Sequence, residues 1–356
     1  METLSIAKQF ALAARPVAVK PLGEGFINDT FVVESDGGPR YLLQRKNHNV
    51  FPDVPAMMDN IVAVTEHIKA KVTDPMRETL SVVPAKDGKP YYRDPDGNYW
   101  AVCLFIEGTR TFDKADSAEL ARQGGIGIGR FQALLSDFDR PLAEVIKGFH
   151  DIRWRFVQWD ASLAADKAGR VKDLKEEISW IESRRDRMLG FWKMVEDGEL
   201  PRSVTHNDTK LSNILFDAKS GKVLCAIDLD TVMSSTALND VGDAIRSYAN
   251  KTFEDDPDYS AVGIDLEIYA AWMAGYLSER KDSLSEKEKE WLAFAPLYIT
   301  YEQVLRFLMD YIDGDTYYKI KYPEHNLVRT RSQYALLQSM EAEYPEMQRI
   351  VKDLLG

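Results

Sequence analysis

Two acids and one amide stand in a fixed order between apolar runs of the chain. Asp208 lies in the stretch Val204–Phe216, Asn213 follows it by five residues, and Asp228 ends the apolar run Val223–Ile227. Phosphoryl transfer from a nucleotide needs a carboxylate beside the attacking hydroxyl and hard oxygen ligands for the magnesium ion that screens the phosphates. The spacing therefore predicts a phosphoryl-transfer centre, although the same residue types also form the turn of a plain strand–loop–strand hairpin.

A glycine-containing hairpin near the start of the chain is a candidate for holding phosphates. Glycines let backbone N–H groups approach phosphate oxygens that a β-carbon would obstruct. The candidate nucleotide contacts are Gly23, Gly25, Asn28 and Thr30, although such a hairpin is by itself usually only a turn. A second cluster, Gly124–Gly129, lies within a helical pattern with no preceding strand, so we interpret it as close helix packing and not as a dinucleotide loop.

The elements that must position these residues divide the chain in two. Short apolar or β-branched segments predict strands at 17–21, 30–34, 41–45, 80–84, 91–93 and 99–106. One helix is predicted over 54–72, with Asp53 as its cap. Helical spacing then recurs over 116–138, 167–197, 264–280, 285–314 and 328–354. The sequence therefore predicts a two-lobed α+β protein, with a small antiparallel β lobe over 1–107 and a larger, mainly helical lobe over 108–356.

The composition of the chain limits the classes of molecule that it is expected to bind. The 356 residues carry a net charge of −12, which argues against nucleic acid, because phosphate backbones are bound through clustered Lys and Arg. No apolar run approaches the roughly 20 residues of a membrane span. The first residues lack the basic and apolar segments of a signal peptide, so we expect a cytoplasmic protein that meets ATP and no membrane. Cys103 and Cys225 lie in apolar runs and are expected to be buried, reduced thiols.

The pattern His-x-Asp-x-x-x-x-Asn, followed by a strand that ends in Asp, resembles the motifs of the aminoglycoside phosphotransferases, a branch of the protein-kinase-like fold. In that fold a lysine on the third strand steadies the nucleotide phosphates. In Tyr41–Lys46 the corresponding residue is Gln44, and Arg45 faces the opposite side. The lysine is therefore missing or displaced, which leaves open a pseudokinase or a phosphate grip through an amide and the metal. Phe105 and Glu107, in the expected lobe connection, are candidate adenine contacts or parts of a plain linker.

Four longer segments resemble those of bacterial N-acetylhexosamine 1-kinases. They are Thr205–Leu211, Ile227–Thr231, Gly242–Arg246 and Lys321–Arg331. The similarity extends from the glycine hairpin to the last helix, and the segment near the C-terminus is the most idiosyncratic of the four. One departure stands in the glycine hairpin, where the family has a histidine and this chain has Phe26.

The resemblance implies a reaction and a set of site residues. The family uses ATP and Mg²⁺ to phosphorylate the anomeric hydroxyl of N-acetylglucosamine or N-acetylgalactosamine, giving the sugar 1-phosphate. By resemblance, Asp208 would bind, orient and deprotonate that hydroxyl, while Asn213 and Asp228 would hold the metal. Arg306 and Tyr317 match positions that the family uses around the sugar, and they are also suitable residue types for sugar hydroxyls and a sugar ring. The apolar Phe26 leaves the choice of hexose open.

Several acids near the motif admit more than one role. Asp230 lies two residues past Asp228, so on an extended segment both carboxylates would face one side, where Asp230 assists the metal or the sugar or caps the next loop. Asp240 and Asp243 are expected to cap or brace the catalytic loop. His206 is expected to be a hydrogen-bonded scaffold. Competing functions are a kinase of an amino-alcohol or aminoglycoside and a non-catalytic sensor.

Overall fold

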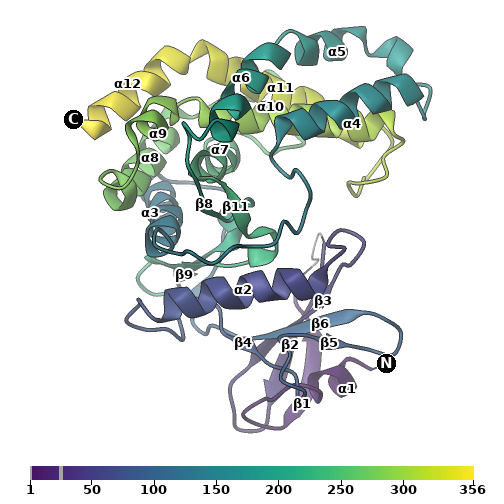
Figure 1. Ribbon diagram of the computed structural model, residues 1–356, viewed down its shortest axis with the longest axis vertical. Helices are drawn as coiled ribbons and strands as arrows, with labels where there is room; N and C mark the ends of the chain where they lie inside the picture. The colour runs from purple at the N-terminus through teal and green to yellow at the C-terminus, as the bar shows by residue number, and fades with distance from the viewer. Residues whose placement is uncertain (1, 24–26) are drawn as a thin grey trace. The chain divides into compact units, whose positions relative to one another are not determined.

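The computed structural model describes residues 2–23 and 27–356, so Gly25 and Phe26 lie outside the described residues (Figure 1). The chain forms two compact units. The first comprises Met1–Arg110, Leu134–Lys147 and Leu215–Ser234. The second comprises Thr111–Ala133, Gly148–Ile214 and Ser235–Gly356. The lobe boundary that the sequence suggested at residue 107 stays a prediction.

An antiparallel sheet dominates the first unit. Its strands are β1 (Pro16–Pro21), β2 (Asp29–Ser35), β3 (Tyr41–Lys46), β4 (Val82–Val83), β5 (Tyr92–Arg93) and β6 (Tyr99–Leu104). The strand order is β1-β2-β3-β6-β4, and β5 also pairs with β6. A smaller sheet in the order β10-β9-β7 consists of β7 (Thr109–Arg110), β9 (Ile214–Asp217) and β10 (Val223–Ala226). The strands predicted over 17–21, 30–34 and 41–45 are confirmed, and β3 runs one residue further, to Lys46. The strand predicted over 99–106 ends two residues early, at Leu104, and only Val82–Val83 of the predicted 80–84 and Tyr92–Arg93 of 91–93 form strands.

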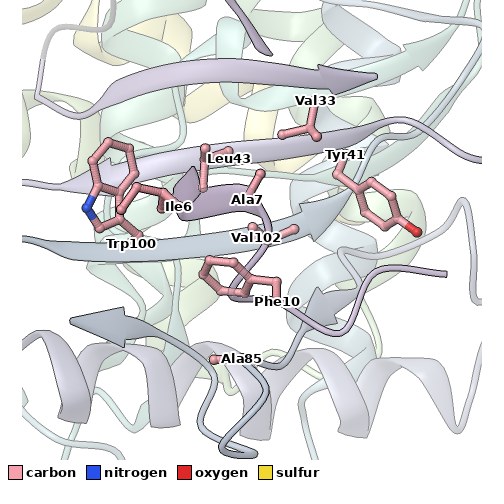
Figure 2. Packing of buried hydrophobic residues seen from close by; sticks show 9 residues of the cluster. All are labelled: Ile6, Ala7, Phe10, Val33, Tyr41, Leu43, Ala85, Trp100 and Val102. Atoms are coloured by element: carbon pink, nitrogen blue, oxygen red, sulfur yellow. The ribbon is translucent and has the colours of Figure 1, made fainter. Parts of the chain in front are cut away.

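The core of this sheet is closed by the first residues of the chain. Ile6 and Ala7 of α1 (Thr3–Ala7) and the adjoining Phe10 pack onto the buried side chains of the strands (Figure 2). The remaining members of the cluster are Val33, Tyr41, Leu43, Ala85, Trp100 and Val102. Burial of this apolar surface fixes the register of β2, β3 and β6, because a shift by one residue would turn every side chain to the opposite face.

Helix α2 (Val54–Lys69) begins where the sequence placed it. The Asp53 carboxylate accepts a hydrogen bond from the backbone N–H of Ala56 at 3.0 Å, as an N-cap residue does. The predicted face is buried along Met57, Ile61, Val64 and Ile68. The helix ends three residues earlier than predicted.

The second unit is mainly helical. Its helices are α3 (Ala118–Leu134), α4 (Ile152–Ala165), α5 (Lys175–Glu182), α6 (Arg185–Glu196), α7 (Ala237–Tyr248), α8 (Leu266–Arg280), α9 (Glu286–Trp291), α10 (Ala295–Ile312), α11 (His325–Ala342) and α12 (Tyr344–Leu355). Two predicted helices are each broken by a proline: Pro296 lies in the first turn of α10, and Pro345 in that of α12. Proline has no N–H and clashes inside a helix, so it starts a new one. The prediction over 167–197 is also wrong, since that segment forms α5 and α6 after a short 3₁₀ turn at Val171–Asp173. Helices α4 and α7 were not predicted.

Helix α10 lies at the centre of the second unit. It packs against α11, α7 and α4, and nearly all of its residues are buried. Three of them are charged and follow one another at four-residue spacing, Glu302, Arg306 and Asp310, which places them on one face of the helix. Buried charges need partners. This face therefore calls for specific contacts, which are described below.

The second glycine cluster packs helices, as predicted. A β-carbon at Gly124 would collide with the ring of Tyr248, and one at Gly125 with the backbone oxygen of Trp272. At Gly129 it would lie 2.8 Å from the backbone oxygen of Tyr276. Helix α3 can approach α8 closely only because these positions lack side chains.

Two further predictions from the sequence concern membrane spans and the cysteines. No helix within the described ranges is both long and apolar enough to cross a membrane. Both cysteines are free; Cys225 is buried as expected, whereas Cys103 is only partly buried.

Candidate active site

The catalytic loop follows strand β8 (Arg202–Thr205) and ends in a 3₁₀ turn over Leu211–Asn213. The structure brings Asp208 and Asn213 together there. Asp208 Oδ2 accepts hydrogen bonds from Asn213 Nδ2 at 2.9 Å and from Lys210 Nζ at 2.8 Å. Asn213 Nδ2 also donates to the backbone oxygen of Asp208 at 2.9 Å. Lys210 was not foreseen, although it lies only two residues after the predicted catalytic acid.

The environment of Asp208 keeps its carboxylate charged. Burial by itself raises the pKa of this group, but the ammonium of Lys210 and the hydrogen bonds from Lys210 and Asn213 outweigh burial, so the pKa lies below its ordinary value of 3.8. An ionised carboxylate only accepts hydrogen bonds. Asp208 is therefore chemically suited to accept the hydrogen bond of a hydroxyl.

Two acids of helix α7 bind the backbone of this loop. The Asp240 carboxylate accepts hydrogen bonds from the backbone N–H groups of His206 at 3.0 Å and Asn207 at 2.8 Å. Asp243 accepts one from Thr209 at 2.8 Å. The bracing role predicted for both acids is confirmed, and both lie within α7. Asn207 is held in the left-handed region at φ 66°, a conformation that needs such support.

The ring of His206 contacts the backbone of the same loop. Its Nδ1 accepts a hydrogen bond from the backbone N–H of Asp208 at 3.2 Å, and its ring lies edge-on to Phe131 of α3. Both contacts fit the scaffold role that the sequence suggested.

A buried network under the loop could not be seen in the sequence. His150 Nε2 lies 3.2 Å from the backbone oxygen of Asn207, and its Nδ1 lies 2.6 Å from the carboxylate of Glu302 on α10. Arg155 of α4 donates to the other oxygen of Glu302 at 3.2 Å. Burial alone would raise the pKa of Glu302, but His150 and Arg155 lower it to about 2. The network thereby links α4 and α10 to the backbone that carries Asp208.

This pKa shift predicts a pH dependence of stability. The folded pKa of Glu302, about 2, lies below its ordinary value of 4.5, so its contribution is complete above pH 4.5 and is lost as the pH falls towards 2. Glu302→Gln removes that titration. We expect the free energy of unfolding, measured with urea between pH 5 and pH 3, to fall less in this variant than in the wild type. Glu290→Gln, a surface acid paired with Lys287, serves as the control and should retain the wild-type slope. Parallel slopes for all three proteins would contradict the assignment.

A lysine that sequence reasoning did not select lies buried at the end of β3. Lys46 Nζ donates to Asp230 Oδ1 and to Gln44 Oε1, each at 2.7 Å, and Lys46 is only 4% exposed. Arg45 points outward to Asp29, as predicted. Lys46 shares the face of Gln44 because alternate strand residues point to the same side. Lys46 therefore lies two residues beyond Gln44 on the same strand face, a position that the same alternation in the sequence could have revealed.

Asp230 joins this lysine to the segment after the glycine hairpin. Its second oxygen, Oδ2, accepts a hydrogen bond from Asn28 Nδ2 at 2.7 Å, and Asn28 Oδ1 accepts one from the backbone N–H of Asn47 at 3.1 Å. The prediction that Asp228 and Asp230 lie on an extended segment is wrong. Asp228 adopts φ 60°, and Asp230 lies in a 3₁₀ turn, Leu229–Thr231. Because the backbone at Asp228 is in the left-handed region, residues 228 and 230 do not follow the alternation of side chains in a strand, on which that prediction depended. A direct role of Asp230 beside the sugar stays a prediction.

The remaining nucleotide candidates belong to the first unit. Gly23 adopts φ 65° and has open space around its α-carbon, so backbone can be approached there. Thr30 Oγ1 accepts a weak hydrogen bond from Gln44 at 3.4 Å. The backbone N–H of Phe105 is bonded to the backbone oxygen of Arg40, and Arg40 also pairs with the exposed Glu107 at 2.7 Å.

The predicted metal ligands have suitable chemistry. Asn213 uses its amide nitrogen within the loop, which leaves its amide oxygen for a cation. Asp228 is a half-buried carboxylate at the start of a 3₁₀ turn. Magnesium commonly takes one or two protein oxygens together with phosphates and water, and these residue types fit that demand. Asn213 belongs to the second unit and Asp228 to the first, and their joint role stays a prediction.

Arg306 and Tyr317 lie together in the second unit. The guanidinium carbon of Arg306 lies 5.8 Å from the ring centre of Tyr317, 5.6 Å from that of Tyr318 and 5.2 Å from that of Phe149. Arg306 is 9% exposed, whereas Tyr317 is 55% exposed. Within the part of the chain that the structure describes, the only hydrogen bond of this guanidinium is a long one to Gln303, at 3.4 Å, and no carboxylate forms an ion pair with it.

Comparison with solved structures identifies the fold. A microcompartment-associated aminopropanol kinase is 16% identical, with a TM-score of 0.63 over 97% of this chain and 98% of that one. An aminoglycoside phosphotransferase from Alicyclobacillus acidocaldarius is 13% identical, with a TM-score of 0.63 over 99% and 97%. An amicoumacin kinase in complex with AMP-PNP and Ca²⁺ is 14% identical, with a TM-score of 0.61 over 94% and 92%. The fold is the protein-kinase-like fold of the aminoglycoside phosphotransferases, as the sequence predicted.

The sequence itself carries the family signature across both units. The family model described as the phosphotransferase enzyme family matches residues 18–279. That range contains the glycine hairpin, Lys46 and the whole catalytic loop. Since the match covers well over half of the sequence, the chain belongs to the phosphotransferase enzyme family.

Proposed function

We propose that this protein is an N-acetylhexosamine 1-kinase, which transfers the γ-phosphoryl group of ATP to the anomeric hydroxyl of N-acetylglucosamine or N-acetylgalactosamine. Family membership supports phosphoryl transfer, and the ionised Asp208 supports a hydroxyl acceptor. The observation that carries the choice of acceptor is the buried guanidinium of Arg306, which forms no ion pair with a carboxylate of the described residues and lies beside the exposed ring of Tyr317. The sequence segments that resemble the N-acetylhexosamine 1-kinases support the same choice.

Asp208 acts on the acceptor in this mechanism. Its carboxylate accepts a hydrogen bond from the anomeric hydroxyl and orients the oxygen towards the γ-phosphorus. It takes the proton as the new P–O bond forms and the bond between the γ-phosphorus and the bridging oxygen breaks, which releases ADP. Asn213 holds Asp208 in place through its amide nitrogen. The amide oxygen of Asn213 and the carboxylate of Asp228 are the groups that would hold Mg²⁺. When bound, Mg²⁺ supplies charge neutralisation on the phosphates of ATP.

Residues of the first unit hold the nucleotide. Lys46 replaces the strand lysine that appeared to be lost, and its ammonium contacts phosphate oxygens once ATP is bound. The backbone at Gly23 approaches the phosphates, with Asn28, Thr30 and Gln44 beside them. Phe105 and Glu107 offer backbone groups to adenine. A buried lysine at this position favours an active kinase over a non-catalytic sensor.

The acceptor contacts argue against a cationic substrate. An amino-alcohol or aminoglycoside carries ammonium groups, which need carboxylates in a buried pocket to offset their loss of hydration. Arg306 places a positive charge there instead, and the nearby Glu302 is already engaged by His150 and Arg155. A guanidinium donates to hydroxyl and amide oxygens, and an aromatic face packs on a sugar ring. A neutral N-acetylated sugar fits these requirements.

A sugar panel tests the proposal. The purified protein is incubated with ATP, Mg²⁺ and separate acceptors: N-acetylglucosamine, N-acetylgalactosamine, glucose, galactose, aminopropanol, choline and kanamycin. We expect turnover of at least one N-acetylhexosamine, with the product identified as the 1-phosphate by ³¹P NMR. Turnover of the amines alone would replace the proposal by an amino-alcohol or aminoglycoside kinase. Nucleotide binding without turnover of any acceptor would favour the sensor.

A further inference from the structure

Asp310 is a buried acid on α10 that makes no contact with the catalytic loop. It lies one helical turn beyond Arg306 on the same helix face and is 4% exposed. Its carboxylate accepts hydrogen bonds from three successive backbone N–H groups of the following loop. Oδ1 accepts from Thr316 at 2.9 Å and from Tyr317 at 2.8 Å, and Oδ2 accepts from Tyr318 at 3.0 Å. A charged acceptor makes such bonds stronger than a neutral one does.

A second set of contacts fixes the start of the same loop. Asn326 of α11 donates from Nδ2 to Asp310 at 2.8 Å and to Asp315 at 2.9 Å. Arg170 donates to the other oxygen of Asp315 at 2.7 Å. The chain reverses direction here through Gly314 at φ 94° and Asp315 at φ 60°, in the left-handed region. The loop is thus held by side chains from three elements.

The held segment carries the two tyrosines that face Arg306. Tyr318 accepts a hydrogen bond from Gln303 of α10 at 3.0 Å, and its ring lies 4.7 Å from that of Phe307. Tyr317 lies edge-on to Tyr318 at 4.8 Å and remains exposed. Since the backbone N–H groups of both tyrosines end on Asp310, this one carboxylate fixes where their rings lie relative to Arg306.

We infer that Asp310 is a positioning residue of the acceptor site, which holds Tyr317 and Tyr318 against Arg306 so that the acceptor meets a preformed surface. This inference rests on the proposed function, since it takes Arg306 and Tyr317 as acceptor contacts. Asp310 does not touch the acceptor. Its effect is to remove the cost of ordering the loop when the acceptor binds. The loss of Asp310 should therefore weaken acceptor binding and leave nucleotide binding unchanged.

The test is Asp310→Asn, which keeps the size of the side chain but turns an N–H₂ group towards one set of donors. We expect the KM for the N-acetylhexosamine to rise about 10-fold or more, because a misplaced positioning group costs up to about 100-fold. The KM for ATP should change by less than about twofold, which separates this role from a general loss of structure. Asp313→Asn is the control: this acid lies just after α10, three residues beyond Asp310, but it contacts Ser162 and Lys167 and not the loop N–H groups.

Hydrogen exchange of the peptide that spans residues 314–320 gives a readout that needs no substrate. Exchange should accelerate in Asp310→Asn and not in Asp313→Asn. Unchanged exchange, or faster exchange with an unchanged acceptor KM, would overturn the inference. If Asp310→Asn fails to fold, Asn326→Ala takes its place, and it must show the same pair of changes. Failure of the proposed function is recognised separately, because the wild type would then turn over no N-acetylhexosamine while its exchange pattern still reported on the loop.

Discussion

Asp208→Asn is expected to lower kcat by at least about 100-fold, since a positioned general base typically contributes about 10² to 10⁴. The substitution keeps the shape of the side chain but removes its charge and its capacity to take a proton. It also places an N–H₂ group where Lys210 and Asn213 now donate to a carboxylate. Turnover is measured at saturating ATP and acceptor, and folding is checked by circular dichroism.

Asp197→Asn is the matched control for this variant. The Asp197 side chain is exposed and pairs with the neighbouring Lys193, so its loss should leave kcat unchanged. ATP binding by Asp208→Asn, measured by calorimetry, should also persist, because the proposed role of Asp208 concerns the acceptor. A near-normal kcat in Asp208→Asn would remove this residue from its catalytic role.

Lys46→Met is expected to reduce kcat/KM for ATP by about 100-fold or more, on the scale of losing one charged donor from a phosphoryl-transfer site. Methionine retains the length of the side chain but not the ammonium. The variant also leaves Asp230 as a buried charge without its cation, which costs about 3 to 5 kcal/mol of folding free energy. Both the rate and the urea midpoint should therefore fall.

A double variant separates these two effects. Lys46→Met combined with Asp230→Asn removes the uncompensated charge, so the midpoint should recover while kcat/KM for ATP stays low. Lys20→Met on β1 is the control, because the ion pair of Lys20 with Glu34 is exposed and contributes little. If the double variant recovered activity together with stability, Lys46 would be a structural residue and the strand lysine would indeed be lost.

The parts of this protein that sequence reasoning predicted depend on short-range physics. The strands of the first unit follow from alternation and turn residues, and α2 follows from its cap at Asp53 and its apolar face. The catalytic loop was recognisable because Asp208 and Asn213 lie only five residues apart, and the loop closes on itself. The breaks at Pro296 and Pro345 are local too, and attention to proline would have predicted them.

The parts that sequence reasoning missed depend on contacts between residues far apart in the chain. Strand alternation places Lys46 on the face of Gln44, but only the structure shows that Asp230, 184 residues later, binds its ammonium. Glu302 beneath the catalytic loop and Asp310 beneath the tyrosine loop are likewise defined by partners on other elements. In the sequence of a helix, such residues resemble ordinary charged residues of the surface. Only the packing of the elements shows that they are buried and which groups they bind. Sequence by itself determined the family and the fold, and it placed Asp208 and Asn213 on one loop. Only the tertiary structure shows which buried charged residues support the site. Burying a charge costs free energy unless a partner compensates it, and these partners lie far away in the sequence.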